Sequence, residues 1–211
     1  MNKASESKIV MALPYQASIG YLTKLTNHPL LLLEKHEHFV KASSRNRCYI
    51  YGANGLHLLS IPVRGGRSHK QLYSETCIDY RQNWPRQHWH SLKSAYGKSP
   101  FFEYYETELG HLYAQRPELH WEWNLALFHW LLKSLKLQVN MAFTQSFEKP
   151  LQAGLIDLRG LEIRSPDQNW PVYYQGFASK HGFLADLAGI DLLFNLGPAA
   201  SLQYLKSIGN R

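Results

Sequence analysis

The chain has 211 residues, a length that suits one large domain with one core and argues against two full domains. Hydrophobic residues make up 45% of it and aromatic residues 13%, which excludes the composition of an intrinsically disordered chain. The net charge of +7 favours an anionic partner, but the excess is dispersed, so a basic pocket for phosphate is favoured over an RNA-coating face.

Cysteine usage and hydropathy bear on the compartment. Only Cys48 and Cys77 are present, too few for a disulfide framework, and this favours a reducing compartment. The apolar run before Pro14 is too short for the core of a signal peptide, and no run approaches the roughly 18 apolar residues of a membrane span. We therefore expect a cytoplasmic protein without a transmembrane segment, in which residues 1–7 are frayed.

The first part of the chain predicts the start of a parallel sheet. Apolar runs over 8–13 and 30–33 indicate two buried strands. Between them, the apolar residues of segment 18–27 follow helical spacing, with Ser18 as a candidate N-cap. A strand, a helix and a strand in this order are typical of a parallel sheet.

A tight hairpin is the clearest local signal in the sequence. Segments 48–51 and 56–61 flank Gly52-Ala53-Asn54-Gly55, and Asn-Gly supplies the positive φ angles that short hairpin turns require. Another strand is predicted over 76–80.

The rest of the chain is mainly helical in pattern. Helices are predicted from Pro85, over 101–114, from Pro117, over 183–195 and over 201–208, and strands over 137–143, 158–163 and 172–175. We predict a single α/β domain over residues 1–211, with packed helices and a mixed β-sheet whose antiparallel part is the hairpin. An α+β arrangement is the alternative.

Charged and amide side chains crowd the segment between the second strand and the hairpin. Arginine presents a planar fork of donors suited to phosphate or carboxylate, and Asn46 can orient a hydroxyl or an amide between such groups. These side chains are therefore candidates for ligand binding, with a set of internal salt bridges as the alternative. The cluster consists of Glu34, Glu37, Lys41, Arg45, Asn46 and Arg47.

A second polar cluster lies where a loop leads into the helix at Pro85. Because a helix N-terminus attracts anions, backbone N–H groups with Arg86 and His88 could hold a phosphate or an oxyanion while Trp84 stacks on a ring. In the alternative interpretation, Gln82 or Asn83 only caps the helix and the tryptophans belong to the core. The cluster consists of Gln82, Asn83, Trp84, Arg86 and His88.

Several sharper motifs are absent from the sequence. It contains no P-loop, no G-x-G-x-x-G, no G-x-S-x-G elbow and no C-x-x-C. The pairs His36 with His38 and His88 with His90 lack a third ligand at recognisable spacing, so we expect no metal site. No motif identifies a cofactor.

A set of short motifs, in order along residues 9–137, carries a resemblance to a known family. They are Arg45-Asn46-Arg47, Asn54-Gly55, Leu59-Ser60-Ile61-Pro62-Val63, Gln82-Asn83-Trp84, Arg86-Gln87-His88-Trp89 and Ser99-Pro100-Phe101-Phe102-Glu103-Tyr104-Tyr105. On these motifs the chain resembles the WbqC-like family. The family's closing segment is similar to Tyr173-Tyr174-Gln175 and Asp191-Leu192-Leu193-Phe194-Asn195-Leu196-Gly197-Pro198, and the stretch before it is short compared with longer relatives.

The resemblance implies a role in the biosynthesis of O-antigen and other surface polysaccharides, for which transfer of glycine onto an amino sugar is one suggestion. In that role, the cluster from Arg45 to Arg47 and Arg86 would hold phosphate or carboxylate. The sugar amine would be deprotonated by Glu34, Glu37 or His88. The implied partners are an anionic small molecule such as a nucleotide sugar and, as a candidate donor, a charged tRNA.

Two other functions stay open. A non-enzymatic module that binds RNA or an anionic glycan would use the positive charge and the aromatic residues. A nucleotide-dependent ligase is suggested by Pro14 to Gly20, which follows the first strand where α/β folds often place nucleotide loops. The transferase hypothesis requires that residues 34–47 and 81–88 converge on one hollow. The sequence does not indicate an oligomeric state.

Overall fold

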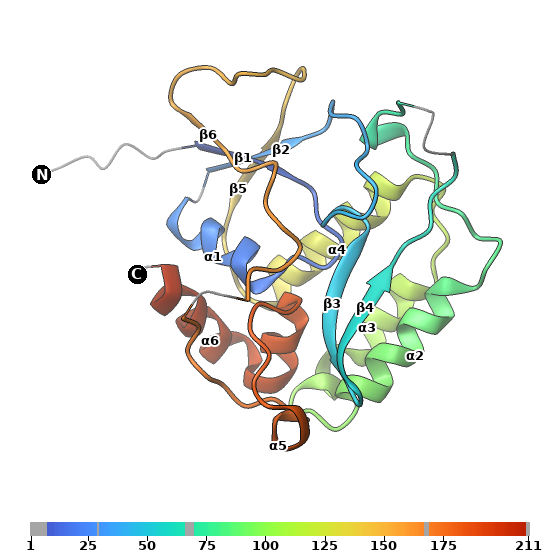
Figure 1. Ribbon diagram of the computed structural model, residues 1–211, viewed down its shortest axis with the longest axis vertical. Helices are drawn as coiled ribbons and strands as arrows, with labels where there is room; N and C mark the ends of the chain where they lie inside the picture. The colour runs from blue at the N-terminus through green and yellow to red at the C-terminus, as the bar shows by residue number, and fades with distance from the viewer. Residues whose placement is uncertain (1–7, 29, 66–69, 167–168, 210–211) are drawn as a thin grey trace, which may run out of the picture.

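The computed structural model describes residues 8–28, 30–65, 70–166 and 169–209, so the expectation for residues 1–7 lies outside the described part (Figure 1). Strands alternate with helices along most of it. The strands are β1 (Lys8–Ala12), β2 (Leu30–Glu34), β3 (Arg47–Gly52), β4 (Gly55–Ser60), β5 (Asn140–Phe143) and β6 (Leu155–Asp157). The helices are α1 (Ile19–Asn27), the 3-10 helix η1 (Tyr73–Glu75), α2 (Trp84–Tyr96), α3 (Phe102–Ala114), α4 (His120–Ser134), α5 (Ala178–His181) and α6 (Gly189–Gly209).

Four strands form a parallel sheet in the order β5-β2-β1-β6. This confirms that the first strand, helix and strand begin a parallel sheet. In the β1–β2 register, Ile9 lies beside Leu31 and Met11 beside Leu33, and all four side chains are buried in the core. The chain adds β2 on one side of β1 and, much later, β6 on the other. The order of connections therefore reverses at β1, and at such a point the carboxyl ends of parallel strands leave a crevice.

The hairpin is confirmed, with Gly52 opposite Gly55 and a two-residue connection between them. Of the Asn-Gly pair only Gly55 takes a positive φ, of 94°, which a residue without a Cβ adopts at little cost. The hairpin forms a two-stranded sheet of its own beside the parallel one. The α/β class, with parallel and antiparallel strands in one molecule, is confirmed.

Helices pack on both sides of the hairpin. Figure 1 shows α1 and α6 side by side on one side of it, and α2 and α3 on the other. Ser18 caps α1 as expected, because its side chain accepts a hydrogen bond from the N–H of Tyr21. At Gly197, where φ is 72°, helix α6 bends; an added Cβ would lie 2.7 Å from the ring of Phe101. In the described ranges, no helix has the length and apolarity needed to cross a bilayer.

Four expectations are corrected by the structure. Residues 76–80 form only isolated bridges at Cys77 and Ile78, because each neighbouring segment pairs with a single residue. The strand expected over 158–163 lies earlier, at β6, since the chain turns away after Asp157.

The other two corrections concern the last part of the chain. Segment 172–175 alternates between exposed and buried side chains like a strand but lies beside no partner strand. Helix α6 starts at Gly189 rather than at residue 183, and Gly197-Pro198 bends it instead of ending it.

Candidate functional site

A pocket of about 530 Å³ lies at the carboxyl ends of the parallel strands. Its walls are the loop that follows β2 and the loop that follows β6, so it occupies the crevice where the strand connections reverse. Its volume falls within the usual range for small-molecule sites. The lining residues are Val40, Ala42, Ser43, Ser44, Arg45, Tyr49, Arg159, Gly160, Leu161, Glu162, Ile163 and Arg164.

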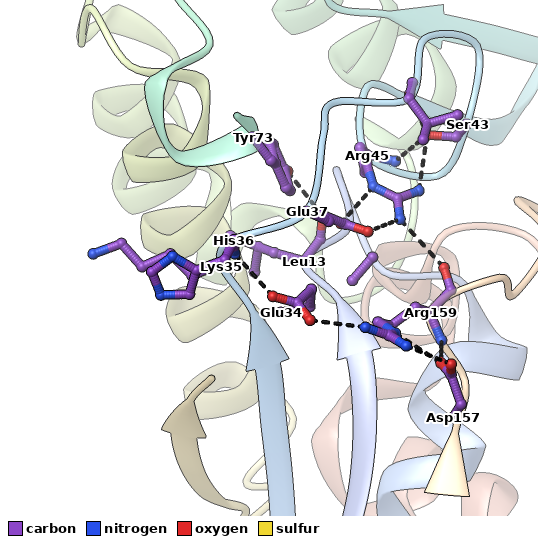
Figure 2. A network of polar contacts seen from close by, with 12 residues as sticks. Leu13, Glu34, Lys35, His36, Glu37, Ser43, Arg45, Tyr73, Asp157 and Arg159 are labelled. Atoms are coloured by element: carbon purple, nitrogen blue, oxygen red, sulfur yellow. Dashed lines mark hydrogen bonds and ion pairs between the residues drawn. The ribbon is translucent and has the colours of Figure 1, made fainter. Parts of the chain in front are cut away.

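One arginine of the pocket is paired with a glutamate of its own loop. Arg45 donates from Nε to Glu37 Oε1 at 2.7 Å and from Nη2 to Glu37 Oε2 at 2.5 Å, and both side chains are only 7% exposed (Figure 2). Such a two-point pair fixes the plane of the guanidinium as well as its position. Its Nη1 has only a longer contact, 3.3 Å to Ser43 Oγ.

A second arginine joins the ends of two strands. Arg159 donates from Nη1 to Glu34 Oε2 at 2.9 Å and from Nη2 to Asp157 Oδ2 at 2.6 Å. The network is continuous because Arg45 Nη2 also donates to the backbone carbonyl of Arg159, at 3.3 Å. Glu34, fully buried, accepts two further bonds, from the N–H of His36 and from Thr144 Oγ1.

Burial and pairing act on these carboxyl groups in opposite directions. Removal from water raises the pKa of Glu37, and its bonds to Arg45 work against that rise. At the more exposed Asp157, the bonds from Arg159 lower the pKa. Three carboxylates thus face two guanidiniums, so the network as a whole supplies no surplus positive charge to the pocket.

Two other side chains give the pocket groups that can meet a ligand. Arg164 Nε donates to the carbonyl of Ala185 at 2.6 Å, while its terminal nitrogens have no partner among the described residues. The guanidinium is therefore anchored at one end and open at the other. Glu162 is exposed and is the one carboxylate among the lining residues that the structure describes.

The structure brings part of the first predicted cluster together. Glu34, Glu37 and Arg45 belong to one network, and Arg45 lines the pocket; internal salt bridges, the alternative interpretation, are present here. Asn46 donates to the carbonyl of Ile61, and its own side-chain oxygen is buried without a partner. The remaining two members lie apart from the network: Lys41 is exposed and contacts the carbonyl of Gly65, and Arg47 begins β3.

The second predicted cluster does not line this pocket. His88 is buried, its Nδ1 lies 2.8 Å from the hydroxyl of Tyr15, and burial, followed by the nearby His57, lowers its pKa to about 4. Trp84 packs edge-on against Trp123 in the core. Gln82, Asn83 and Arg86 are exposed, and Asn83 occupies the N-cap of α2 without a side-chain capping bond. The two clusters therefore do not share the pocket.

Sequence reasoning missed Asp157, Arg159 and Arg164. A signal was available, because Asp157 and Arg159 directly follow the short apolar run that forms β6. The strand expected over 158–163 covered these positions and hid their role as loop residues at a strand end.

A buried carboxylate in the closing segment was missed as well. Asp191 is fully buried, and its pKa is raised by burial. It accepts hydrogen bonds from the hydroxyls of Tyr96 and Tyr173 and, at 3.1 Å, from Gln175 Nε2. This network ties the end of α2 to the start of α6 and is occupied entirely by protein groups.

The loop from Pro14 to Gly20 lacks an open anion site at the start of α1. Asp186 Oδ1 accepts from the N–H of Gly20 at 2.6 Å, and Oδ2 accepts from the N–H of Ser165 at 2.6 Å. A carboxylate already lies where a phosphate would bind, which removes the physical basis for the ligase hypothesis. Within the described ranges, no three His, Cys, Asp or Glu side chains are grouped as metal ligands.

Comparison with known proteins places the chain in a family. Residues 12–157 match the model of the WbqC-like protein family, which is more than half of the chain. The match includes the loop after β2 and ends at the last residue of β6, just before the loop that forms the other wall of the pocket. No curated protein and no solved structure matches the chain. The chain belongs to the WbqC-like protein family.

Proposed function

We propose that the chain is a transferase of surface polysaccharide (O-antigen) biosynthesis, which moves an aminoacyl group such as glycyl onto an amino sugar. Two things support this proposal: what membership of the WbqC-like family implies, and a pocket of small-molecule size at the strand ends. The pocket is the observation that carries it, because its lining combines one open guanidinium, one exposed carboxylate and hydroxyl groups.

In this proposal the acceptor is a nucleotide-linked amino sugar. The open end of Arg164 binds its phosphate, since a guanidinium presents two parallel donors to phosphate oxygens. Ser43 and Arg45 Nη1 lie on the opposite wall and bind sugar hydroxyls. The apolar side chains of the lining, with Tyr49, contact the sugar ring.

The chemistry requires a base for the acceptor amine. Its nitrogen attacks the carbonyl carbon of the donor ester, for which a charged tRNA is a candidate; an amide bond forms, and the bond to the ribose oxygen breaks. Glu162 accepts the amine proton, and the leaving oxygen is protonated in turn. Glu34 and Glu37, expected as bases, act in this proposal as positioning residues that hold Arg159 and Arg45.

The test is formation of the amide. Purified protein would be mixed with a nucleotide-linked amino sugar and glycyl-tRNA, and the glycylated sugar detected by mass spectrometry. We expect Arg164→Gln to raise KM about tenfold with little change in kcat, because it removes a charge-assisted phosphate contact. Glu162→Gln should lower kcat about a hundredfold and leave sugar binding intact.

Arg81→Gln is the matched control, since Arg81 is exposed, pairs with Asp79 and lies outside the pocket. The proposal is wrong if the wild-type protein forms no adduct and binds neither substrate. It is also wrong if the adduct forms at unchanged rates in the Arg164 and Glu162 variants.

A further inference from the structure

The exposed face of α2 carries a polar stripe. Arg86, His90 and Ser94 follow one another at intervals of four residues, which places them on one face of the helix. Arg86 Nε lies 3.4 Å from His90 Nε2, so the permanent charge of the arginine stays beside the imidazole. His88, two residues before His90, points inward to Tyr15 instead.

The stripe faces the turn of the hairpin across a pocket of about 360 Å³. The turn contributes backbone and polar side chains, among them the second imidazole of the pocket, His57. Among the lining residues there is no carboxylate. They are Gly52, Ala53, Asn54, Gly55, Leu56, His57, His90, Ser91, Ser94 and Ala95.

We propose that this pocket binds the phosphoryl group of a small phosphorylated ligand. Two imidazoles and two serine hydroxyls line it, and Arg86 lies beside it, so donors outnumber any group that would repel an anion. In the buried network every guanidinium already pairs with a carboxylate, whereas Arg86 forms no ion pair among the described residues. The site is separate from the pocket at the strand ends and stands without the transferase proposal.

The size of the pocket favours a small molecule over a nucleic acid. Its volume suits a phosphate with a sugar or a second phosphate attached. A nucleic-acid face would need several phosphate contacts spread along the surface, with a steep dependence on salt. The pocket gathers its donors at one place.

Imidazole resonances provide a direct test on the full chain. Inorganic phosphate and a nucleoside diphosphate would be titrated in turn while the histidine ring signals are followed by NMR. We expect the signals of His57 and His90 to shift with saturation, and that of His129, exposed on α4, to stay in place. Arg86→Gln and His90→Gln should each weaken binding about tenfold, because each removes one donor to a charged ligand.

The matched controls are Arg81→Gln and His129→Gln, which alter exposed residues away from the pocket. The inference fails if the two ring signals do not move at millimolar ligand, or if Arg86→Gln binds as tightly as the wild type. It also fails if only an RNA oligomer binds, or if phosphate shifts residues 159–164 and not His57 and His90.

Discussion

Two arginine-bearing regions of this molecule differ in how their charge is used. At the strand ends, Arg45 and Arg159 are almost fully buried and each is held by carboxylates. Beside the hairpin turn, Arg86 is exposed and contacts only an imidazole. Buried charges without partners are costly, so the first region must balance its charge to fold, and the second is free to offer its charge to a ligand. An arginine count alone does not separate the two cases.

The largest effect should come from breaking the buried network. Arg159→Met keeps much of the side-chain volume but leaves Glu34 buried without its cation, and we expect a loss of about 4 kcal/mol in the free energy of unfolding. Urea denaturation measures it. Arg81→Met, which removes an arginine that is 89% exposed, serves as control and should shift the midpoint little. An unchanged midpoint for Arg159→Met would show that the network is not closed in solution.

Acid should reveal the buried imidazole of the second region. The pKa of His88 is lowered from 6.5 to about 4 by burial, so below pH 6.5 the unfolded chain binds a proton that the folded chain excludes. Stability is therefore retained above pH 6.5 and lost as the pH falls towards 4, by roughly 3 kcal/mol. Thermal unfolding of wild type and His88→Gln across this range isolates the contribution. Parallel pH profiles for the two proteins would contradict the assignment.

A smaller loss is expected at the buried carboxylate of the closing segment. The hydroxyl of Tyr96 donates to Asp191 Oδ1 at 2.9 Å and accepts from the N–H of Tyr51 at 3.2 Å. Tyr96→Phe removes both bonds and should cost about 2 kcal/mol. Urea midpoints would measure the change, with Tyr104→Phe, at an exposed tyrosine, as the matched control. Equal midpoints for the two variants would argue against this network.

The smallest effect is expected at an exposed ion pair. Lys133 Nζ lies 3.1 Å from Glu108 Oε1, with side chains 75% and 55% exposed. Water and salt screen such pairs, so Lys133→Gln should change the unfolding free energy by less than about 0.5 kcal/mol. A loss as large as that of Arg159→Met would remove the contrast between buried and exposed charge drawn above.

Much of the fold followed from local patterns. The opening strand, capped helix and strand, and the hairpin at Asn54-Gly55, are encoded by neighbouring residues and were predictable. Segment 172–175 has the alternation of a strand, but its buried side chains Tyr173 and Gln175 contact Asp191. Periodicity reports which side chains are buried and not what covers them, and this explains the misassignment.

The candidate site was predictable only in part. Arg45 and Glu37 lie close in sequence, and their proximity in space could be expected. Their link to Arg159 depends on the pairing of β6 with β1, which no local pattern contains. Conversely, Arg86 and His88 lie two residues apart on a helix and so point in nearly opposite directions. That geometry alone separates them as partners for one anion.

The pairing of β6 with β1 also sets an order of events during synthesis. Strand β1 leaves the ribosome among the first residues, but its second neighbour follows about 150 residues later. Until then one side of β1 has unpaired backbone groups, which is the kind of edge that recruits other chains. The nascent protein must therefore keep that edge protected for most of its translation, and the mouth of the strand-end pocket forms only when Arg159 arrives.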